Sequence, residues 1–181
     1  MLPDLLAPNL TVVFVGTSKS TTSSRTGRYY ANPQNMFWNL LEATGLAGDK
    51  WIGPSRDETL LHHGVGLTDL VPGRAASSDA LLTASDYRVL GFIERIEQHA
   101  PAVVAFNGEK AAAKVAQHLN QAKLAEGPAT WMIGDSLFYR LPSSSSAHAT
   151  GGYAAKRAKW VEFGQWVQQQ IGASPEADPA P

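Results

Sequence analysis

The sequence predicts an α/β fold: a three-layer sandwich with a short, mostly parallel central sheet flanked by helices. The main observation is an alternation along the chain. Short apolar runs rich in β-branched and aromatic residues, typical of buried strands, alternate with segments of helical periodicity. The length of 181 residues, with 44% hydrophobic and 17% charged residues, fits one globular domain with a sizeable core. We expect that domain to span residues 1–172.

The first strand and helix have the clearest signals. The run Val12–Val15 predicts a buried strand over 11–16 that ends at Gly16, and Asn35 is a capping residue for a helix that stops at Gly45. The elements expected in the first half of the chain are strands at 11–16 and 64–71, a helix at 35–44 and a short helix at 56–62.

The second half begins with a loop rich in small residues from Pro72 to Ser85. Pro101 ends a helical pattern, and the dipeptide Asn107-Gly108 turns an apolar strand directly into the next helix. The expected elements are helices at 84–99, 109–119 and 153–171, and strands at 102–106, 131–133 and 137–141, the last two forming a hairpin or a broken strand. Residues 173–181 are rich in proline and acids and are expected to be disordered.

Composition limits the chemistry. The chain has no cysteine, which excludes disulfides, thiolate metal sites and cysteine nucleophiles. Its N-terminus does not resemble a signal peptide, and no apolar run is long enough to span a bilayer. We therefore expect a cytoplasmic protein that does not interact with membranes. A net charge of −1 argues weakly against binding nucleic acid by bulk electrostatics.

Ligands of open α/β sheets bind beyond the carboxyl ends of the strands, so the polar loop after Gly16 is the expected site. The loop lacks both nucleotide-binding glycine motifs, and no G-x-S-x-G serine elbow occurs. The adjacent His62 and His63 would point to different faces of a helix, so we assign no metal and no cofactor.

Four segments resemble one known family. They are VVFVG followed by TG-x-x-Y-x-x-P-x-N-x-FW, then G-x-T-D-L-V at 66–71, V-x-F-N-G at 104–108 and L-P-S-S-S at 141–145. In this order and spacing they are similar to motifs of the mismatch-specific uracil/thymine DNA glycosylases. The resemblance covers about residues 5–171.

The resemblance implies base recognition in the first loop. Such enzymes extrude a damaged base from DNA into a pocket. The matching residues are Gly16, Thr17 as a backbone donor, Tyr30 as the ring on which the base stacks, and Asn107. An aromatic that only packs in the core remains the alternative for Tyr30.

Ser18 departs from the family pattern. The family usually has an asparagine there, which positions the attacking water, whereas a serine hydroxyl cannot act as a base near neutral pH. We expect Asp69, in an otherwise apolar segment near the end of the second strand, to orient and deprotonate water. An aspartate that caps the following loop or pairs with Arg74 is the alternative.

Cations and small residues are expected to contact DNA. Ser143, Ser144, Ser145 and Ser146, followed by His148, match the family's loop that enters the duplex, and their small size predicts shallow penetration. The cations expected near phosphates are Lys19, Arg25, Arg28, Lys156 and Arg157, with ordinary surface solvation as the alternative.

The sequence therefore predicts a monofunctional DNA glycosylase of the mismatch-specific type. It would hydrolyse the N-glycosidic bond of uracil and leave an abasic site. It would work as a monomer, with double-stranded DNA as the expected partner and single-stranded DNA as a further candidate. Two alternatives stay open: a lesion-binding protein of the same fold without catalysis, and a nucleoside or nucleotide hydrolase.

Overall fold

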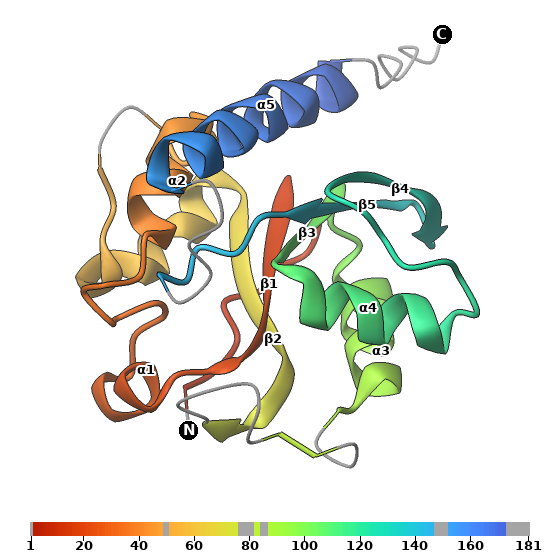
Figure 1. Cartoon of the computed structure of the whole chain (residues 1–181), viewed down its shortest axis with the longest axis horizontal. Coiled ribbons are helices and arrows are strands. Elements are labelled where there is room, and N and C mark those ends of the chain that lie inside the picture. The colour runs from red at the N-terminus through yellow and green to blue at the C-terminus, as the bar shows by residue number, and fades with distance from the viewer. Residues whose placement is uncertain (1, 49–50, 76–81, 84–86, 147–151, 173–181) are drawn as a thin grey trace, which may run out of the picture.

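A computed structural model of the chain describes residues 2–48, 51–75, 82–83, 87–146 and 152–172. Its described residues build a five-stranded sheet in the order β2-β1-β3-β5-β4 (Figure 1). The strands are β1 (Val12–Lys19), β2 (Val65–Ala75), β3 (Val103–Asn107), β4 (Gly127–Ile133) and β5 (Ser136–Leu141). All neighbours are parallel except β4 and β5, which form an antiparallel hairpin. The predicted mostly parallel sheet is confirmed.

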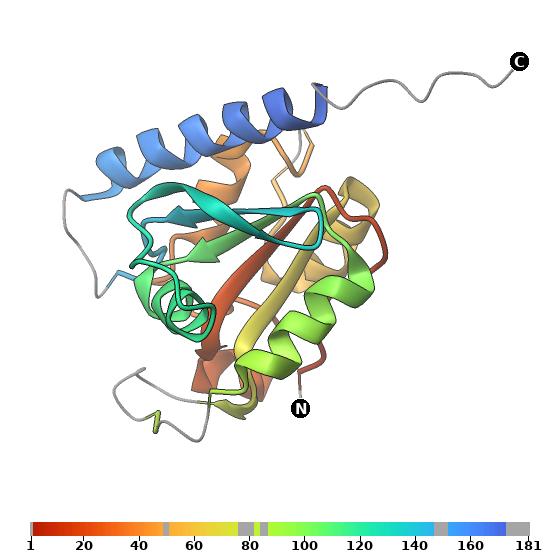
Figure 2. The same cartoon turned by 90° about the vertical axis from the view of Figure 1, so that its right-hand side faces the viewer.

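Helices cover both faces of this sheet, as Figure 2 shows from the side. They are α1 (Thr21–Thr26), α2 (Phe37–Thr44), α3 (Val89–His99), α4 (Glu109–His118), α5 (Gly152–Gly172) and a 3-10 segment, η1 (Pro54–His63). Alternation of side chains along β1 divides its apolar residues between two cores. Val12 and Phe14 pack with α2, α5 and η1, whereas Val13 and Val15 pack with α3 and α4.

The first core is strongly aromatic. The Phe14 ring stacks on Trp160 of α5 at 5.5 Å between centroids and meets the edge of Phe37 of α2 at the same distance. Burying each such side chain contributes about 1.5–3 kcal/mol to stability. At Gly164 of α5, an added Cβ would lie only 2.2 Å from the Thr44 carbonyl oxygen, so the glycine lets α5 and α2 approach closely.

Strand order creates a switch point beside β1. The chain leaves β1 toward β2 on one side and later returns to β3 on the other side. β3 ends at Asn107, one residue beyond the last β1–β3 pair, Val15 and Phe106, while β1 continues. A crevice at the carboxyl ends of the strands is where ligands bind in such sheets. The residues after Val15 therefore lie at the expected place for a site.

Several predicted boundaries were wrong. β1 runs to Lys19 instead of ending at Gly16, and α1 follows it where a loop was expected. β2 continues through Pro72 to Ala75, and its register with β1 shifts between Ser18 and Lys19. Proline is tolerated on an edge strand and at such an irregularity, because few ladder hydrogen bonds are lost there. The start expected for the helix at 84–99 falls partly outside the described residues.

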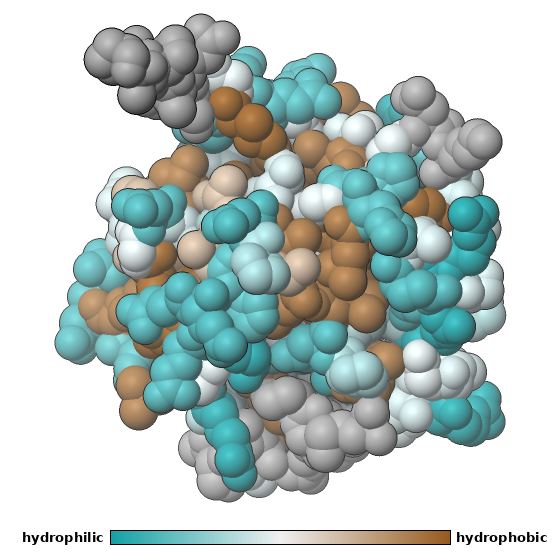
Figure 3. Space-filling model, turned by 180° about the vertical axis from the view of Figure 1, so that it is seen from behind, coloured by the Kyte–Doolittle hydropathy of each residue, from teal (hydrophilic) through white to brown (hydrophobic). Residues whose placement is uncertain are grey.

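The surface mixes polar and apolar areas. Seen from behind, hydrophobic atoms gather near the middle of a largely hydrophilic face (Figure 3). In the described part of the chain, no helix has both the length and the apolar character that crossing a membrane would need. The predicted disordered tail, 173–181, lies outside the described residues.

Candidate active site

Gly16 and Asp69 face each other across two strands. The register pairs Gly16 of β1 with Asp69 of β2, and the Asp69 carboxylate lies over the glycine. A Cβ added at Gly16 would lie 2.3 Å from Asp69 Oδ1 and 3.3 Å from the Tyr30 hydroxyl oxygen. Glycine is needed here because two polar side chains occupy the space of a side chain. Three of the predicted site residues thus converge.

Tyr30 is fixed in this group from two sides. Its ring stacks on Phe37, with 3.8 Å between centroids and 12° between planes. Its backbone has a φ of 48°, a left-handed conformation that is rare for a tyrosine, and its carbonyl accepts a hydrogen bond from Trp38 Nε1 at 3.3 Å. Such a conformation persists only where the surroundings hold it, as is common at functional sites.

The Tyr30 hydroxyl stays neutral near physiological pH. Burial raises the pKa of Tyr30 well above its usual value, the Asp69 charge raises it further, and the Asn107 side chain acts in the opposite direction. Tyr30 is therefore a neutral ring with one face on Phe37 and its hydroxyl among polar groups.

A buried carboxylate holds the chain before Tyr30. Asp57 of η1 accepts a hydrogen bond from the Tyr29 backbone N–H at 2.8 Å, and its other oxygen accepts one from Arg28 at 2.7 Å. Arg28 also contacts Glu58. Asp57 is 3% exposed and so acts as an internal anchor for this loop.

Asn107 closes the far side of the site by binding the serine loop. Its amide oxygen accepts the Ser144 backbone N–H and its amide nitrogen donates to the Ser144 hydroxyl, both at 2.8 Å. That hydroxyl donates in turn to Asn35 Oδ1 at 2.8 Å, and the Ser144 carbonyl accepts the Met36 N–H at 3.0 Å. The network ties β3, the loop after β5 and the start of α2 together.

This network corrects the prediction for Ser144. The side chain is fully buried and hydrogen-bonded, so it is an internal link and not a DNA contact. Ser143 accepts the Ser145 N–H at 3.2 Å, and the Ser145 carbonyl accepts a bond from Lys156. Ser146 is exposed, whereas His148 lies outside the described residues.

A family model for the uracil DNA glycosylase superfamily matches residues 3–174. The chain belongs to this superfamily. Its fold also resembles the solution NMR structure of a candidate uracil DNA glycosylase from Methanosarcina acetivorans, with a TM-score of 0.61 and 22% sequence identity. That match covers 92% of this chain and 96% of the other.

Within this superfamily fold, the predicted DNA-binding cations divide into two groups. Lys19 and Lys156 are buried and make contacts inside the protein. Arg28 is partly exposed and is paired with Asp57 and Glu58, so its phosphate contact stays a prediction. Lys156 Nζ donates to the Ser145 carbonyl at 2.9 Å, and burial lowers the pKa of this lysine. Arg25 and Arg157 are exposed, as a phosphate contact requires.

Thr17 and Ser18 are half-buried residues of β1 rather than loop residues. Ser18 pairs with Val71 of β2 and, two positions from Gly16, lies on the same face of the strand as the Asp69 side chain. Both residues therefore remain close to the group formed by Gly16, Tyr30 and Asp69.

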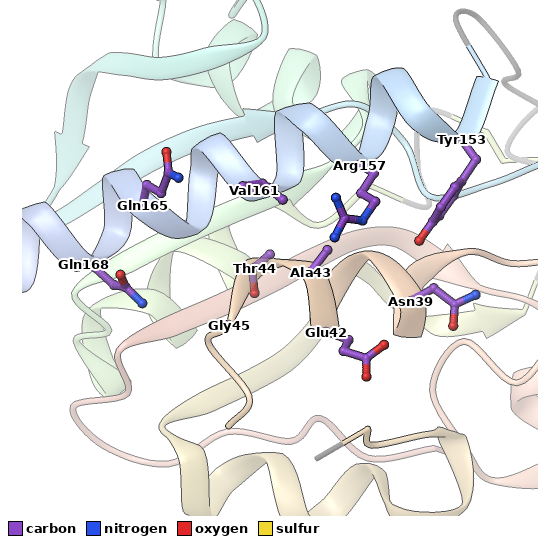
Figure 4. A pocket seen from close by; sticks show the side chains of 10 residues that line it. All are labelled: Asn39, Glu42, Ala43, Thr44, Gly45, Tyr153, Arg157, Val161, Gln165 and Gln168. Carbon is purple, nitrogen blue, oxygen red and sulfur yellow. The ribbon is translucent and has the colours of Figure 1, made fainter. Parts of the chain in front are cut away.

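A separate pocket of about 420 Å³ lies between α2 and α5 (Figure 4). Polar side chains from both helices line it, among them Glu42, Tyr153 and Arg157. None of the residues predicted to bind the base lines it. Among the side chains that the structure describes, no group of three or more His, Asp or Glu could hold a metal ion.

Three residues near the site were missed from sequence. Asp57 holds Tyr29, Asp4 lies 3.7 Å from Lys19 Nζ and 3.3 Å from Arg95 Nε, and Arg95 donates to the Asp69 carbonyl at 2.9 Å. No motif marks these positions, because their roles depend on contacts between segments far apart in the chain. The alternative partner Arg74 has no described side chain.

Proposed function

We propose that this member of the uracil DNA glycosylase superfamily is a monofunctional enzyme of the family type known as mismatch-specific uracil DNA glycosylases, which removes uracil from DNA and leaves an abasic site. Family membership supports a glycosylase acting on DNA. The observation that carries the finer proposal is the Asp69 carboxylate placed over Gly16, beside the Tyr30 hydroxyl, at the switch point of the sheet. We further propose that it works as a monomer in the cytoplasm.

The extruded base would stack on Tyr30. Phe37 covers one face of the ring and fixes its plane, so the base would lie on the other face. Because the tyrosine is held in advance by Phe37, Trp38 and its anchored neighbour Tyr29, little ordering is left for the binding step. The backbone N–H of Thr17 would donate to the base as negative charge develops on it.

The reaction is a hydrolysis. Water attacks C1′ of the sugar while the bond from C1′ to the base nitrogen breaks, and the base leaves with that electron pair. Asp69 orients the water, accepts its proton and stabilises the positive charge on the sugar. General base catalysis of this kind increases a reaction rate by about 10²–10⁴-fold. Ser18, on the same face of β1, would hold the water by its hydroxyl without acting as a base.

The serine loop supports a broad choice of substrate. Ser144 is fixed inside the protein, which leaves Ser143, Ser145 and Ser146 as the described small residues of the loop that could enter the DNA duplex. A shallow insertion would read the opposite base weakly, so uracil in single strands would also be a substrate. Activity confined to G·U mismatches would contradict this proposal.

One observation favours a second candidate, a lesion-binding protein without catalysis. Asp69 is buried and lies 3.7 Å from Lys19 Nζ, a contact that could serve stability alone. An excision assay separates the candidates. We expect base release from uracil-containing double- and single-stranded oligonucleotides and none from free deoxyuridine. Binding without release would identify the second candidate, and release from deoxyuridine would identify a nucleoside hydrolase.

A further inference from the structure

Lys19 is a buried cation close to Asp69, the proposed general base. Its residue is 4% exposed, and its Nζ lies 3.7 Å from Asp69 Oδ2. Regular alternation from Gly16 and Ser18 would turn Lys19 to the other face of the sheet. The shift of register between Ser18 and Lys19 breaks that alternation, and the ammonium group lies on the Asp69 side.

The same ammonium group has a second carboxylate neighbour from the N-terminal segment. Asp4 Oδ1 lies 3.7 Å from Lys19 Nζ, and the antiparallel bridge between Leu5 and Leu67 ties this segment to the edge of β2. Asp4 also accepts a hydrogen bond from the Tyr29 hydroxyl at 3.1 Å. Lys19 is therefore shared between two carboxylates.

Arg95 of α3 completes this group from another element. Its Nε lies 3.3 Å from Asp4 Oδ2, and one of its terminal nitrogens donates to the Asp69 backbone carbonyl at 2.9 Å. Among the described residues, the charged and titratable groups gathered around Asp69 include Lys19 from β1, Asp4 from the N-terminal segment, Arg95 from α3, and Tyr29 and Tyr30 from the loop before α2.

We propose that Lys19 is a positioning residue that keeps Asp69 ionised and oriented for catalysis, and that Asp4 limits this effect by sharing the ammonium group. This inference rests on the proposed glycosylase function. The physical reason is the position of Asp69: a buried carboxylate is more easily protonated, and a general base must be ionised to accept a proton. A cation within about 4 Å restores the charged form.

The test is the pH dependence of single-turnover uracil excision. In Lys19→Met the side chain keeps most of its length but loses its charge. We expect the acid limb of the pH–rate profile of this variant to move to higher pH by about one unit or more. At a given pH on that limb, the excision rate would then fall by about tenfold. In Asp4→Asn a competing negative charge disappears, so the acid limb should move to lower pH.

The opposite directions distinguish positioning from stability. A merely structural Lys19 would lower the rate equally at all pH values and leave both limbs unmoved. Lys19→Arg, which keeps the charge, should retain an acid limb close to that of the wild type. Lys159→Met removes an exposed lysine of α5 that pairs with Glu162, and it should leave the limb unchanged.

The outcomes separate this inference from the function on which it rests. A wild-type protein that excises no uracil overturns both. An active wild type with an unmoved limb in Lys19→Met and Asp4→Asn overturns the role of Lys19 alone. Circular dichroism checks the folding of each variant. If Lys19→Met does not fold, the Asp4→Asn variant tests the inference: a shift of its acid limb to lower pH supports it, and an unmoved limb overturns it.

Discussion

At the scale of single residues, Gly16 shows that side chains from other segments can require a glycine at a position in a strand. The sequence pattern predicts that the first strand ends at Gly16, yet this glycine lies inside β1, paired with Asp69. The space over its Cα belongs to the Asp69 carboxylate and the Tyr30 hydroxyl. The sequence showed that a small residue stands here, but the reason for it comes from two segments distant along the chain.

Gly16→Ala should disturb the site directly. The added methyl would lie 2.3 Å from Asp69 Oδ1, so Asp69 or the strand must move. We expect the free energy of unfolding to fall by about 1–3 kcal/mol, the usual cost of overpacking, and uracil excision to fall more than binding. Urea denaturation and excision assays measure the two effects.

Gly91→Ala is the matched control. It lies in α3, where an added Cβ meets only Arg95 Nη1 at 4.0 Å. Alanine is favoured over glycine in a helix by about 0.5–1 kcal/mol, so this variant should be as stable as the wild type or more stable. Equal behaviour of the two variants would contradict the close packing of Asp69 on Gly16.

At the scale of elements, the regular parts were predictable and the polar end of β1 was not. Apolar runs located β1, β3 and β5, and Gly45 ends α2 with a left-handed φ of 71°, as expected for a C-terminal glycine. Thr17, Ser18 and Lys19 resembled a loop by composition, and only pairing with β2 makes them strand. Five of the six residues of α1 are serine or threonine, which have low helix propensity, and the Ser20 side chain caps the first turn of this helix.

The role of the serine run, 143–146, was also not predictable from composition, because it depends on contacts with distant segments. Its composition resembles a flexible DNA-contacting loop, but Ser144 is hydrogen-bonded to Asn107 and Asn35. Ser144→Ala would remove the hydroxyl that accepts from the Asn107 amide nitrogen and donates to Asn35 Oδ1, while the bond from the residue's backbone N–H to Asn107 would remain. We expect the free energy of unfolding to fall by about 1–3 kcal/mol.

Exposed Ser146 provides the comparison for this measurement. Ser146→Ala should change the free energy of unfolding by less than about 0.5 kcal/mol. Chemical denaturation of both variants tests the assignment. A stable Ser144→Ala protein with weakened DNA binding would restore the original DNA-contact interpretation.

At the scale of the whole molecule, the net charge of −1 predicts modest electrostatic binding of DNA. The contacts that Lys19, Arg28 and Lys156 make with groups of the protein itself predict the same. The fold class could be predicted from sequence because alternation of strands and helices is a property of the entire chain. The contacts of these cations with carboxylates and carbonyls inside the protein could not be predicted, because they depend on which segments meet across the sheet.

Salt dependence of DNA binding tests this distribution of charge. Each phosphate contact contributes about −0.9 to the slope of log Kobs against log salt concentration. Exposed Arg25 and Arg157 are the expected contacts, so Arg25→Gln and Arg157→Gln should each make the slope shallower by about one. Lys123→Gln, which removes an exposed lysine paired with Glu109, should leave it unchanged.

The central claim is that Asp69 is the base of a DNA glycosylase, and single-turnover excision by Asp69→Asn tests it most directly. Asparagine keeps the shape of the side chain but cannot accept the proton from water. The account predicts that the variant folds and binds uracil-containing DNA while its excision rate falls by about 10²–10⁴-fold. A folded Asp69→Asn protein that excises uracil at nearly the wild-type rate would contradict it.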